Sequence, residues 1–422
     1  MKNNKILIIC RDFIPYYPTF GGVIRVLTLA EFLLNHGREV YVLTSTGKDF
    51  GTFGYDYLLN KIHVDYVEDK WKENFQQRIK KATQGNLDNK KKTLVNRFKD
   101  KLKDFILDFI IPDTGIFVTK SYYKKAKKII QTHDIKNIMV SSPPHSMQLP
   151  GSKLKKYFGD DLNLIIDYRD SWNTTSIFSK KYFVNQFISR RKEKKALARC
   201  DYFIYISQPI KDKAEKTFKL NLEAKSSLVM NGFHKEIQTK EREDHDKIHL
   251  GYFGVLSTKK DSIRDASKLF ELFKDPEINS RIELMVYGQL DNDNDEIYEY
   301  PGLHFYRSVS HSEALRKMGQ MDFLLIVHSD PDNSDEVITG KLFEYIAVKK
   351  PVVCLSPKNM EARRIIENNG IGMGIDIEKP DEIRDKLLKL PEYKGYDFYK
   401  NVDISRFKRE EQYKKILSLL KC

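Results

Sequence analysis

Apolar runs alternate with amphipathic stretches along most of the chain. The run at 5–10 is apolar after its first residue, which is typical of a parallel strand covered on both faces. Apolar residues then recur with helical spacing over 23–36, Gly37 fits the position after a helix C-terminus, and a second apolar run follows at 39–44. This order of strand, loop, helix and strand predicts an α/β protein with doubly wound parallel sheets.

The same alternation continues through the rest of the chain. Helices are expected at 122–132, from about 262, at 360–368 and at 380–389. A chain of 422 residues exceeds the usual size of one domain, so two domains are expected. The further strands are expected at 137–142, 162–167, 202–207, 227–230, 248–253, 282–287, 323–328 and 351–355.

Residues 70–115 interrupt this alternation and form a basic insertion. Between Trp71 and Ile110 there are 11 Lys or Arg residues against 5 Asp or Glu residues. Large apolar residues share one face of a predicted helix at about 94–109, and lysines lie elsewhere around it. Such a helix can lie in the interface of an anionic membrane. The alternative is a helix that packs on its own domain and exposes its lysines to solvent.

The composition narrows the choice of partners. A formal net charge of +14 favours an anionic partner, which includes nucleotide phosphates, an anionic membrane and nucleic acid. Nucleic acid ranks last, because the chain has no zinc-finger spacing, RNA-binding motif or arginine-rich tail. Four scattered cysteines fit a reducing compartment, and the first apolar run is too short for a signal peptide or a membrane span. We therefore expect a cytoplasmic protein, with peripheral attachment to the inner face of the plasma membrane as an option.

The stretch 334–347 carries the most informative polar residues. Thr339 is a suitable N-cap for a helix that starts at Gly340, and Lys341 lies in the first turn. A lysine at this point opposes the helix dipole, and a phosphate bound by the lysine and the free backbone N–H groups would remove the conflict. Glu344 lies on the same face three residues later. The alternative is a simple surface pair between Lys341 and Glu344.

Glu336 and Glu344, followed by Tyr-Ile-Ala, resemble the donor-sugar signature of glycosyltransferase family 4. The Lys-Leu-Phe-Glu-Tyr run at 341–345 most resembles the bacterial polysaccharide and lipopolysaccharide branch of that family. The resemblance implies the GT-B fold, in which two Rossmann-like domains face each other across a cleft and a C-terminal helix crosses back. The implied boundaries are 1–232 for the acceptor-side domain, 233–247 for a charged linker, 248–400 for the nucleotide-sugar domain and 401–422 for the crossing helix.

The resemblance also implies roles for the residues of the second half. Glu344 would hold the ribose hydroxyls, and Glu336 would face the donor sugar beside the reacting carbon as a catalytic residue. The donor diphosphate would contact Lys341, the backbone around Thr339, Gly340 and Leu342, and Lys259. The arginine that relatives often carry after the first strand is replaced by Val255 or Leu256, and Ser257 could compensate for it. No metal or other cofactor is expected, because the acidic run at 291–295 lies in a predicted loop far from the cleft.

Three blocks in the first half resemble the same family. The pair Gly21–Gly22 would lie near the donor phosphate, although an ordinary tight loop is the alternative. The Ser-Ser-Pro-Pro-His block and the Arg-Asp-Ser-Trp block each follow a predicted strand, so both are expected at one edge of the sheet. These blocks make His145 and Arg169 candidates for acceptor binding, and Asp170 a catalytic candidate. The alternatives are a cap or core hydrogen bond for His145, and an N-cap or a partner of Arg169 for Asp170.

The residues and the resemblance together predict a retaining glycosyltransferase. It would move a hexosyl or N-acetylhexosaminyl group from a nucleotide-diphosphate sugar, with UDP as the default, to a glycan or lipid-linked acceptor. One alternative is an epimerase or hydrolase of sugar nucleotides with the same fold. Another is a membrane-associated scaffold without catalytic activity. Turnover without an acceptor would indicate the first alternative, and failure to bind any nucleotide would indicate the second.

Overall fold

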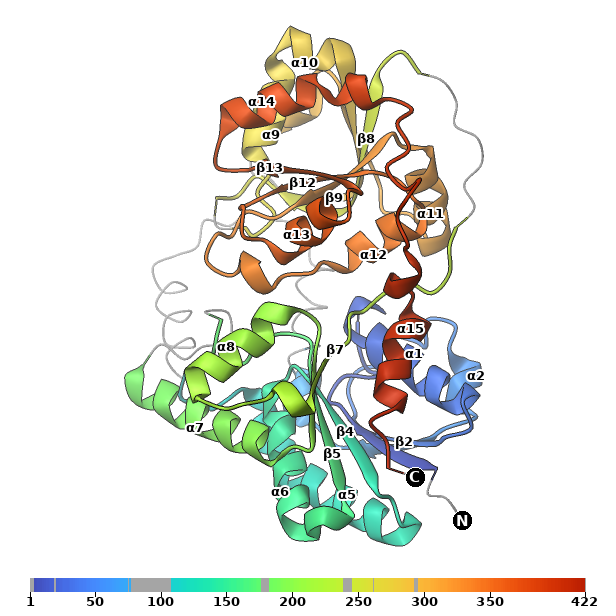
Figure 1. Ribbon diagram of the computed structural model, residues 1–422, viewed down its shortest axis with the longest axis vertical. Coiled ribbons are helices and arrows are strands. Elements are labelled where there is room, and N and C mark those ends of the chain that lie inside the picture. Colours follow the sequence, from blue (N-terminus) through green and yellow to red (C-terminus); the bar gives the residue numbers. More distant parts are fainter. Residues whose placement is uncertain are drawn as a thin grey trace. The chain divides into compact units, whose positions relative to one another are not determined.

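The protein consists of two compact units (Figure 1). In a computed structural model, the first unit comprises Met1–Val229 and Tyr413–Cys422, and the second comprises Met230–Gln412. Each unit is built on one parallel sheet, as the alternation of apolar and amphipathic stretches predicts. The structure describes residues 4–18, 20–74, 76, 108–175, 182–237, 245–260, 262–291 and 295–421.

The first unit has a parallel sheet of seven strands in the order β3-β2-β1-β4-β5-β6-β7. The order reverses between β1 and β4, and ligands of such sheets bind beyond the strand ends next to this switch point. The strands are β1 (Lys5–Ile9), β2 (Glu39–Ser45), β3 (His63–Val67), β4 (Asn137–Ser142), β5 (Asn163–Tyr168), β6 (Tyr202–Tyr205) and β7 (Ser226–Leu228).

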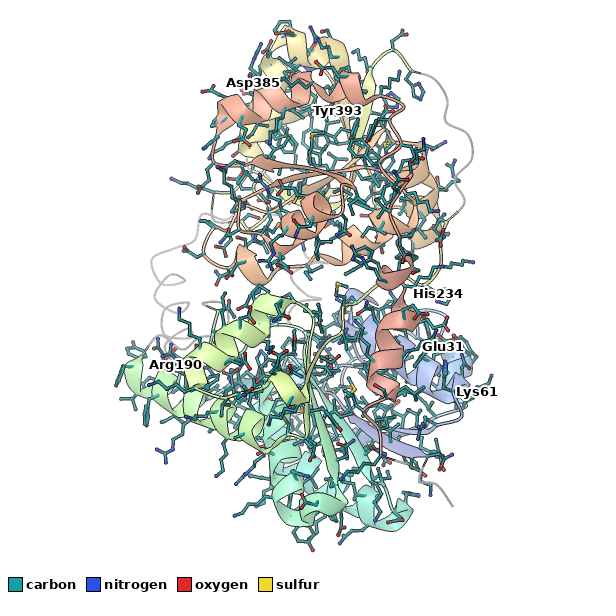
Figure 2. The ribbon with its side chains drawn as sticks, in the orientation of Figure 1. Glu31, Lys61, Arg190, His234, Asp385 and Tyr393 are labelled. Carbon is teal, nitrogen blue, oxygen red and sulfur yellow. The ribbon has the colours of Figure 1, made fainter. Side chains whose placement is uncertain are left out.

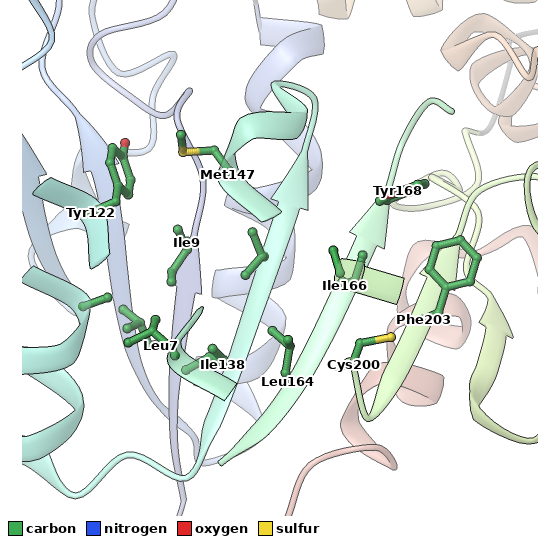
Figure 3. Packing of buried hydrophobic residues seen from close by; sticks show 14 of the residues in the cluster. Leu7, Ile9, Tyr122, Ile138, Met147, Leu164, Ile166, Tyr168, Cys200 and Phe203 are labelled. Atoms are coloured by element: carbon green, nitrogen blue, oxygen red, sulfur yellow. The ribbon is translucent and has the colours of Figure 1, made fainter. Parts of the chain in front are cut away.

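Helices cover both faces of this sheet, since its central strands bury alternate residues on opposite sides. One face packs against α5 (Thr119–His133), α6 (Gln148–Phe158), α7 (Phe183–Arg199) and α8 (Gln208–Phe218). Figure 3 shows part of this layer, where Leu7, Ile138 and Leu164 come from three adjacent strands. The other face packs against α1 (Phe20–Asn35), α2 (Asp56–Leu59) and the end of α15 (Arg409–Leu417).

The second unit repeats the plan with six strands in the order β10-β9-β8-β11-β12-β13. The switch point lies between β8 and β11. One face packs against α9 (Ser267–Glu271), α10 (Pro276–Arg281) and α14 (Pro380–Leu388), and the other against α11 (His311–Gln320), α12 (Gly340–Ala347) and α13 (Glu361–Asn368). The strands are β8 (Ile248–Ser257), β9 (Ile282–Asp291), β10 (Leu303–Tyr306), β11 (Phe323–Val327), β12 (Val352–Ser356) and β13 (Gly372–Asp376).

Several boundaries differ from the expected ones. Helix α1 begins at Phe20, so Gly21 and Gly22 lie inside its first turn and not in the loop before it. Strands β8 and β9 continue four residues beyond their expected ends, paired from Gly254 with Gly288 to Ser257 with Asp291. Of the predicted basic helix at 94–109, only residues 108 and 109 fall within the described ranges. Among the helices in the described part of the chain, none combines the length and apolarity that crossing a bilayer requires.

Candidate functional site

Helix α12 begins where the sequence predicts, because Thr339 caps it. The Thr339 side chain accepts a hydrogen bond from Lys341 N at 3.3 Å, and Thr339 O accepts one from Leu342 N at 3.1 Å. The Leu342 side chain is fully buried in the core, which fixes how the helix faces. Gly340 is exposed, and a Cβ atom added there would meet nothing within 4 Å. The entrance of the helix is therefore capped, anchored by Leu342 and open beside Gly340.

The Lys341 side chain lies against the carboxyl-end portion of strand β8. Its Nζ donates a hydrogen bond to the Tyr252 hydroxyl at 2.6 Å and lies 3.9 Å from the centre of that ring. The hydroxyl in turn donates to Val255 O at 2.8 Å. A side chain on residue 254 would block this arrangement, because a Cβ atom added to Gly254 would lie 2.8 Å from Lys341 Nζ. The glycine therefore lets the lysine lie close to the strand.

The surroundings of Lys341 stabilise its charge poorly. Burial, and then the positive charge of Arg264, lower the pKa of Lys341 to about 7, while Glu344 acts in the opposite direction. Burial raises the pKa of Tyr252 to about 12, so this hydroxyl is neutral and does not compensate the lysine. The first turn of α12 has no acidic residue, and the helix dipole adds further positive potential there. A bound anion would offset the positive charges of Lys341 and Arg264 and the positive potential of the helix dipole.

Arg264 is a basic residue of this site that sequence reasoning missed. It is exposed in the loop between β8 and α9, and its charge lowers the pKa of both Lys341 and His328. A hydrogen bond of 3.1 Å from Asp265 N to Ser329 Oγ ties this loop to the end of β11. The Arg264 guanidinium forms no ion pair or hydrogen bond with any described residue. Its charge is therefore available to a ligand beside Lys341.

The sequence predicts Lys259 and Ser257 as the diphosphate contacts of this loop. In the structure both side chains bind Asp291. Lys259 pairs with Asp291 on the surface, where the two side chains are 42% and 54% exposed. Ser257 is buried, and its hydroxyl donates to Asp291 O at 3.1 Å and accepts from Lys259 N at 3.0 Å. These contacts join the ends of β8 and β9. Arg264, rather than Lys259, is the cation of this loop whose charge acts on Lys341.

The two loop cations can be ranked by nucleotide binding. We expect Arg264→Gln to weaken UDP binding about tenfold, because a charged hydrogen bond to phosphate is lost. Lys259→Gln removes an exposed cation that already has a partner, so we expect less than about a twofold change. Isothermal titration calorimetry with UDP on both variants measures the difference. If Lys259→Gln lost more UDP affinity than Arg264→Gln, Lys259 would be the residue that contacts the diphosphate.

Glu344 lies one helical turn after Lys341 but does not form a direct ion pair with it. Its carboxylate is 3.7 Å from His311 Nδ1, and its side chain is 37% exposed. Burial raises the pKa of Glu344, while the charges of His311, Lys341 and Arg409 oppose this rise. The simple surface pair between Lys341 and Glu344 is therefore absent. A partly exposed acid beside a buried cation remains at the helix entrance.

Two further buried side chains lie on segments of the same unit, one before α12 and one after β11. Glu336 ends the short turn Ser334–Glu336 that precedes α12, and it is 7% exposed. His328 directly follows β11, and its Nε2 makes no hydrogen bond with any described residue. Burial lowers the pKa of His328, so its ring is neutral at physiological pH. A histidine immediately after a buried strand was a signal in the sequence that could have identified it. In the described ranges, no three His, Cys, Asp or Glu side chains gather as a metal site.

In the first unit, Arg169 joins the first turn of α1 to the loop after β4, at the switch point of the sheet. Its Nη1 donates to Gly22 O at 2.7 Å and its Nη2 donates to Pro143 O at 2.6 Å. A Cβ atom on Gly22 would come within 2.2 Å of the Tyr17 ring, so a larger residue there would require this side chain to move, whereas Gly21 has free space around it. The guanidinium of Arg169 thus has backbone partners and fixes the start of α1 against the end of β4.

His145 and Asp170 lie in contrasting environments. His145 is buried and stacks on Trp172 with ring centres 5.5 Å apart. Burial, and then the charge of Arg169, lower the pKa of His145 to about 3, so it is neutral and cannot serve as a proton donor near neutral pH. His145 is thus held in the core by ring stacking on Trp172. Asp170 is exposed two residues after the end of β5 and is the more accessible candidate of the two.

No protein-family model matches the chain, and no curated protein matches it. Solved structures do resemble it over their whole length. A glycosyltransferase from Rickettsia africae ESF-5 is 13% identical, with 99% of this chain and 97% of that chain covered and a TM-score of 0.63. The lipopolysaccharide outer core galactosyltransferase WaaB is also 13% identical, with 98% of both chains covered and a TM-score of 0.60. The chain has the GT-B fold.

An epimerase shares this fold as well. The UDP-GlcNAc 2-epimerase from Neisseria meningitidis, solved with UDP-GlcNAc, is 11% identical, with 98% of this chain and 99% of that chain covered and a TM-score of 0.53. The predicted GT-B architecture is therefore confirmed. At these identities the fold alone is common to a transferase and an epimerase, so the chemistry must be argued from the site.

Proposed function

We propose that this protein is a retaining glycosyltransferase that uses a nucleotide-diphosphate sugar. The observation that carries the proposal is the environment of Lys341. A half-buried lysine with a pKa of about 7 lies at a capped helix entrance, against a neutral tyrosine and under the charge of Arg264, which has no ion pair among the described residues. The charges of Lys341 and Arg264 and the helix dipole all favour an anion, and the diphosphate of a UDP-sugar is such an anion. Glu344, one turn further along, supplies the acceptor oxygens that vicinal ribose hydroxyls require.

In the proposed reaction, the bond between the anomeric carbon and the diphosphate oxygen breaks while a bond to the acceptor oxygen forms on the same face. The acceptor hydroxyl gives its proton to the departing phosphate oxygen. Lys341 and Arg264 stabilise the negative charge that develops on the leaving diphosphate, a role that needs no metal or other cofactor. Glu336 stabilises the positive charge at the anomeric carbon. The capped helix entrance keeps the lysine in place before the substrate arrives.

The first unit is proposed to bind the acceptor, a glycan or lipid-linked glycan of surface polysaccharide biosynthesis. Asp170 is exposed at the end of β5, where it can contribute its charge to an incoming hydroxyl. Arg169 acts indirectly, because its contacts with Gly22 and Pro143 position the loops around it. The basic segment at 94–109 is a proposed contact with an anionic membrane at the inner face of the cytoplasmic membrane.

The decisive experiment separates nucleotide binding from transfer. A panel of UDP-, GDP- and ADP-sugars is first tested for stabilisation of the purified protein against thermal unfolding, and UDP-sugars are expected to raise the midpoint most. The stabilising donor is then incubated with and without glycan acceptors. Transfer that depends on the acceptor supports the proposal. Release or epimerisation of the sugar without any acceptor would favour the epimerase or hydrolase alternative, and failure of every nucleotide to bind would favour the scaffold.

The pH dependence of UDP binding provides a further check. The free protein has Lys341 with a pKa of about 7, far below the usual value for lysine, and a bound diphosphate should raise it again. Binding therefore takes up a proton above pH 7, and the affinity should fall by up to about tenfold per pH unit between pH 7 and pH 9. Calorimetry in buffers of different ionisation enthalpy measures the proton uptake. An affinity that is constant across this range would contradict the assignment of Lys341.

A further inference from the structure

The first turns of helix α7 of the first unit carry polar residues on the inner face and large apolar residues on the outer face, the reverse of an ordinary surface helix. The residues that face inward include Asn185, Ser189 and Glu193, which are all buried. The residues that face outward at the start of the helix are large and apolar. A surface helix normally buries its apolar stripe and exposes its polar one. This inversion requires an explanation.

The orientation of α7 is fixed by hydrogen bonds to its buried polar residues. Asn185 Nδ2 donates to Asp108 Oδ2 at 2.8 Å, and Ser189 Oγ accepts from Trp172 Nε1 at 3.0 Å. Glu193 Oε2 accepts two hydrogen bonds, from Asn173 N at 3.1 Å and from Asn173 Nδ2 at 2.6 Å. Rotating the helix to bury its apolar face would leave these groups without partners, at a considerable cost in stability. The outward apolar face is therefore a built feature of the fold.

The exposed apolar residues gather at the first two turns of α7. Phe183 is 79% exposed, Val184 is 64% exposed and Phe187 is 55% exposed, and Ile188 is also exposed. Phe109 extends this patch from a distant part of the chain, since it is exposed and its ring centre lies 5.7 Å from that of Tyr182. We call the residues Phe109, Tyr182, Phe183, Val184, Phe187 and Ile188 the apolar patch. Contiguous exposed apolar residues of this kind mark interaction surfaces.

The outer face of the same helix changes from apolar to basic after Ile188. Arg190, Arg191, Lys194 and Lys195 are exposed, and Figure 2 labels Arg190 on this helix. None of the four forms an ion pair with a carboxylate of the described residues. The one acid of this segment, Glu193, points inward to Asn173. The helix thus presents an apolar end followed by a basic end, both on its solvent side.

We propose that the outer face of α7 binds an anionic lipid bilayer. The apolar patch enters the region between headgroups and acyl chains, where aromatic residues are favoured, and the basic end lies on the lipid phosphates. The basic residues next to the apolar patch favour an anionic bilayer over an apolar protein as the partner. An apolar protein partner would account for the patch but not for four adjacent cations without acids between them on the surface. This inference is independent of the proposed catalytic activity, and of its residues only Phe109 belongs to the segment 94–109.

Flotation of the full-length protein with vesicles tests the proposal. Vesicles of phosphatidylcholine alone are compared with vesicles containing 30 mol% phosphatidylglycerol (about one lipid in three), and stronger binding to the anionic ones is expected. The double variant F183S/F187S should reduce binding to the anionic vesicles at least about tenfold. The double variant R190E/R191E should also reduce it at least about tenfold, since each cation near the surface strengthens partitioning roughly fivefold.

Two matched control variants test whether any loss of charge or of an exposed aromatic side chain, wherever it lies, weakens vesicle binding. K124E/K128E makes the same charge change at two exposed lysines of α5, and Y396S removes an aromatic side chain that is 65% exposed in the second unit. Both should change binding less than about twofold, and thermal unfolding of all variants verifies that they fold. The proposal fails if F183S/F187S binds anionic vesicles like the parent protein, or if R190E/R191E has no more effect than K124E/K128E. It also fails if light scattering shows a dimer that F183S/F187S dissociates, because a second copy would then cover the patch.

Discussion

Replacing Lys341 with methionine is expected to weaken UDP binding about 100-fold and at the same time to stabilise the free protein. The loss of affinity corresponds to about 2.7 kcal/mol, within the range for a charged hydrogen bond to phosphate at a site shielded from water. The stabilisation arises because burial and the charge of Arg264 disfavour the protonated amine of the half-buried Lys341, which lowers its pKa to about 7. Methionine keeps the length of the side chain and removes the charge, so the thermal midpoint should rise by about 2 °C or more at pH 6.

Weaker UDP binding together with a more stable free protein would distinguish an anion-binding lysine from a structural one. A lysine with a purely structural role would lose stability when replaced, since its hydrogen bond to Tyr252 would be lost. Lys358 provides the control, because it is exposed in the same unit and has no charged partner among the described residues. Lys358→Met should leave both UDP affinity and the midpoint unchanged. If Lys341→Met binds UDP with the parent affinity, the anion site at the entrance of α12 does not exist.

The central strands of both sheets could be predicted from the sequence because each is buried on both faces and is almost continuously apolar. Strands β3, β10 and β13 were missed. Each is at the edge of its sheet, and its sequence lacks a continuous apolar run. Helix α7 was missed for a different reason. The large apolar residues of its first two turns face solvent while Ala196 and Leu197 near its end face the core, so hydrophobic periodicity does not indicate how the whole helix packs.

The candidate site could be predicted only where its residues are neighbours in the sequence. The cap at Thr339, the lysine in the first turn and the acid one turn later all follow from local helix geometry. Arg264 could not be found in this way, because its place depends on a loop that is held to Ser329, far away in the sequence. His145 illustrates the reverse case. Its position after a strand favours exposure, whereas stacking on Trp172 places it in the core.

Replacing Glu344 with alanine is expected to weaken UDP binding about 30-fold and to abolish discrimination between UDP and 2′-deoxy-UDP. In the parent protein, the carboxylate would accept hydrogen bonds from both ribose hydroxyls, so the deoxy compound should bind about tenfold more weakly than UDP. The variant has no acceptor for either hydroxyl and should bind both compounds equally. Calorimetry with both nucleotides on both proteins measures how far the preference for UDP over 2′-deoxy-UDP depends on Glu344. Glu378→Ala, which removes an exposed acid elsewhere in the same unit, is the control and should change neither affinity.

The same carboxylate should limit UDP binding on the acid side. Burial raises the pKa of Glu344 above its usual value, so the residue becomes protonated at a higher pH than an exposed glutamate. Protonation removes acceptor capacity toward the ribose, and affinity should fall as the pH drops through this raised pKa. Lys341 weakens binding as the pH rises above about 7, so the parent protein should show a maximum between the two limits. Glu344→Ala should lose the acid limb and keep the alkaline one. An acid limb that persists in this variant would mean that another group binds the ribose.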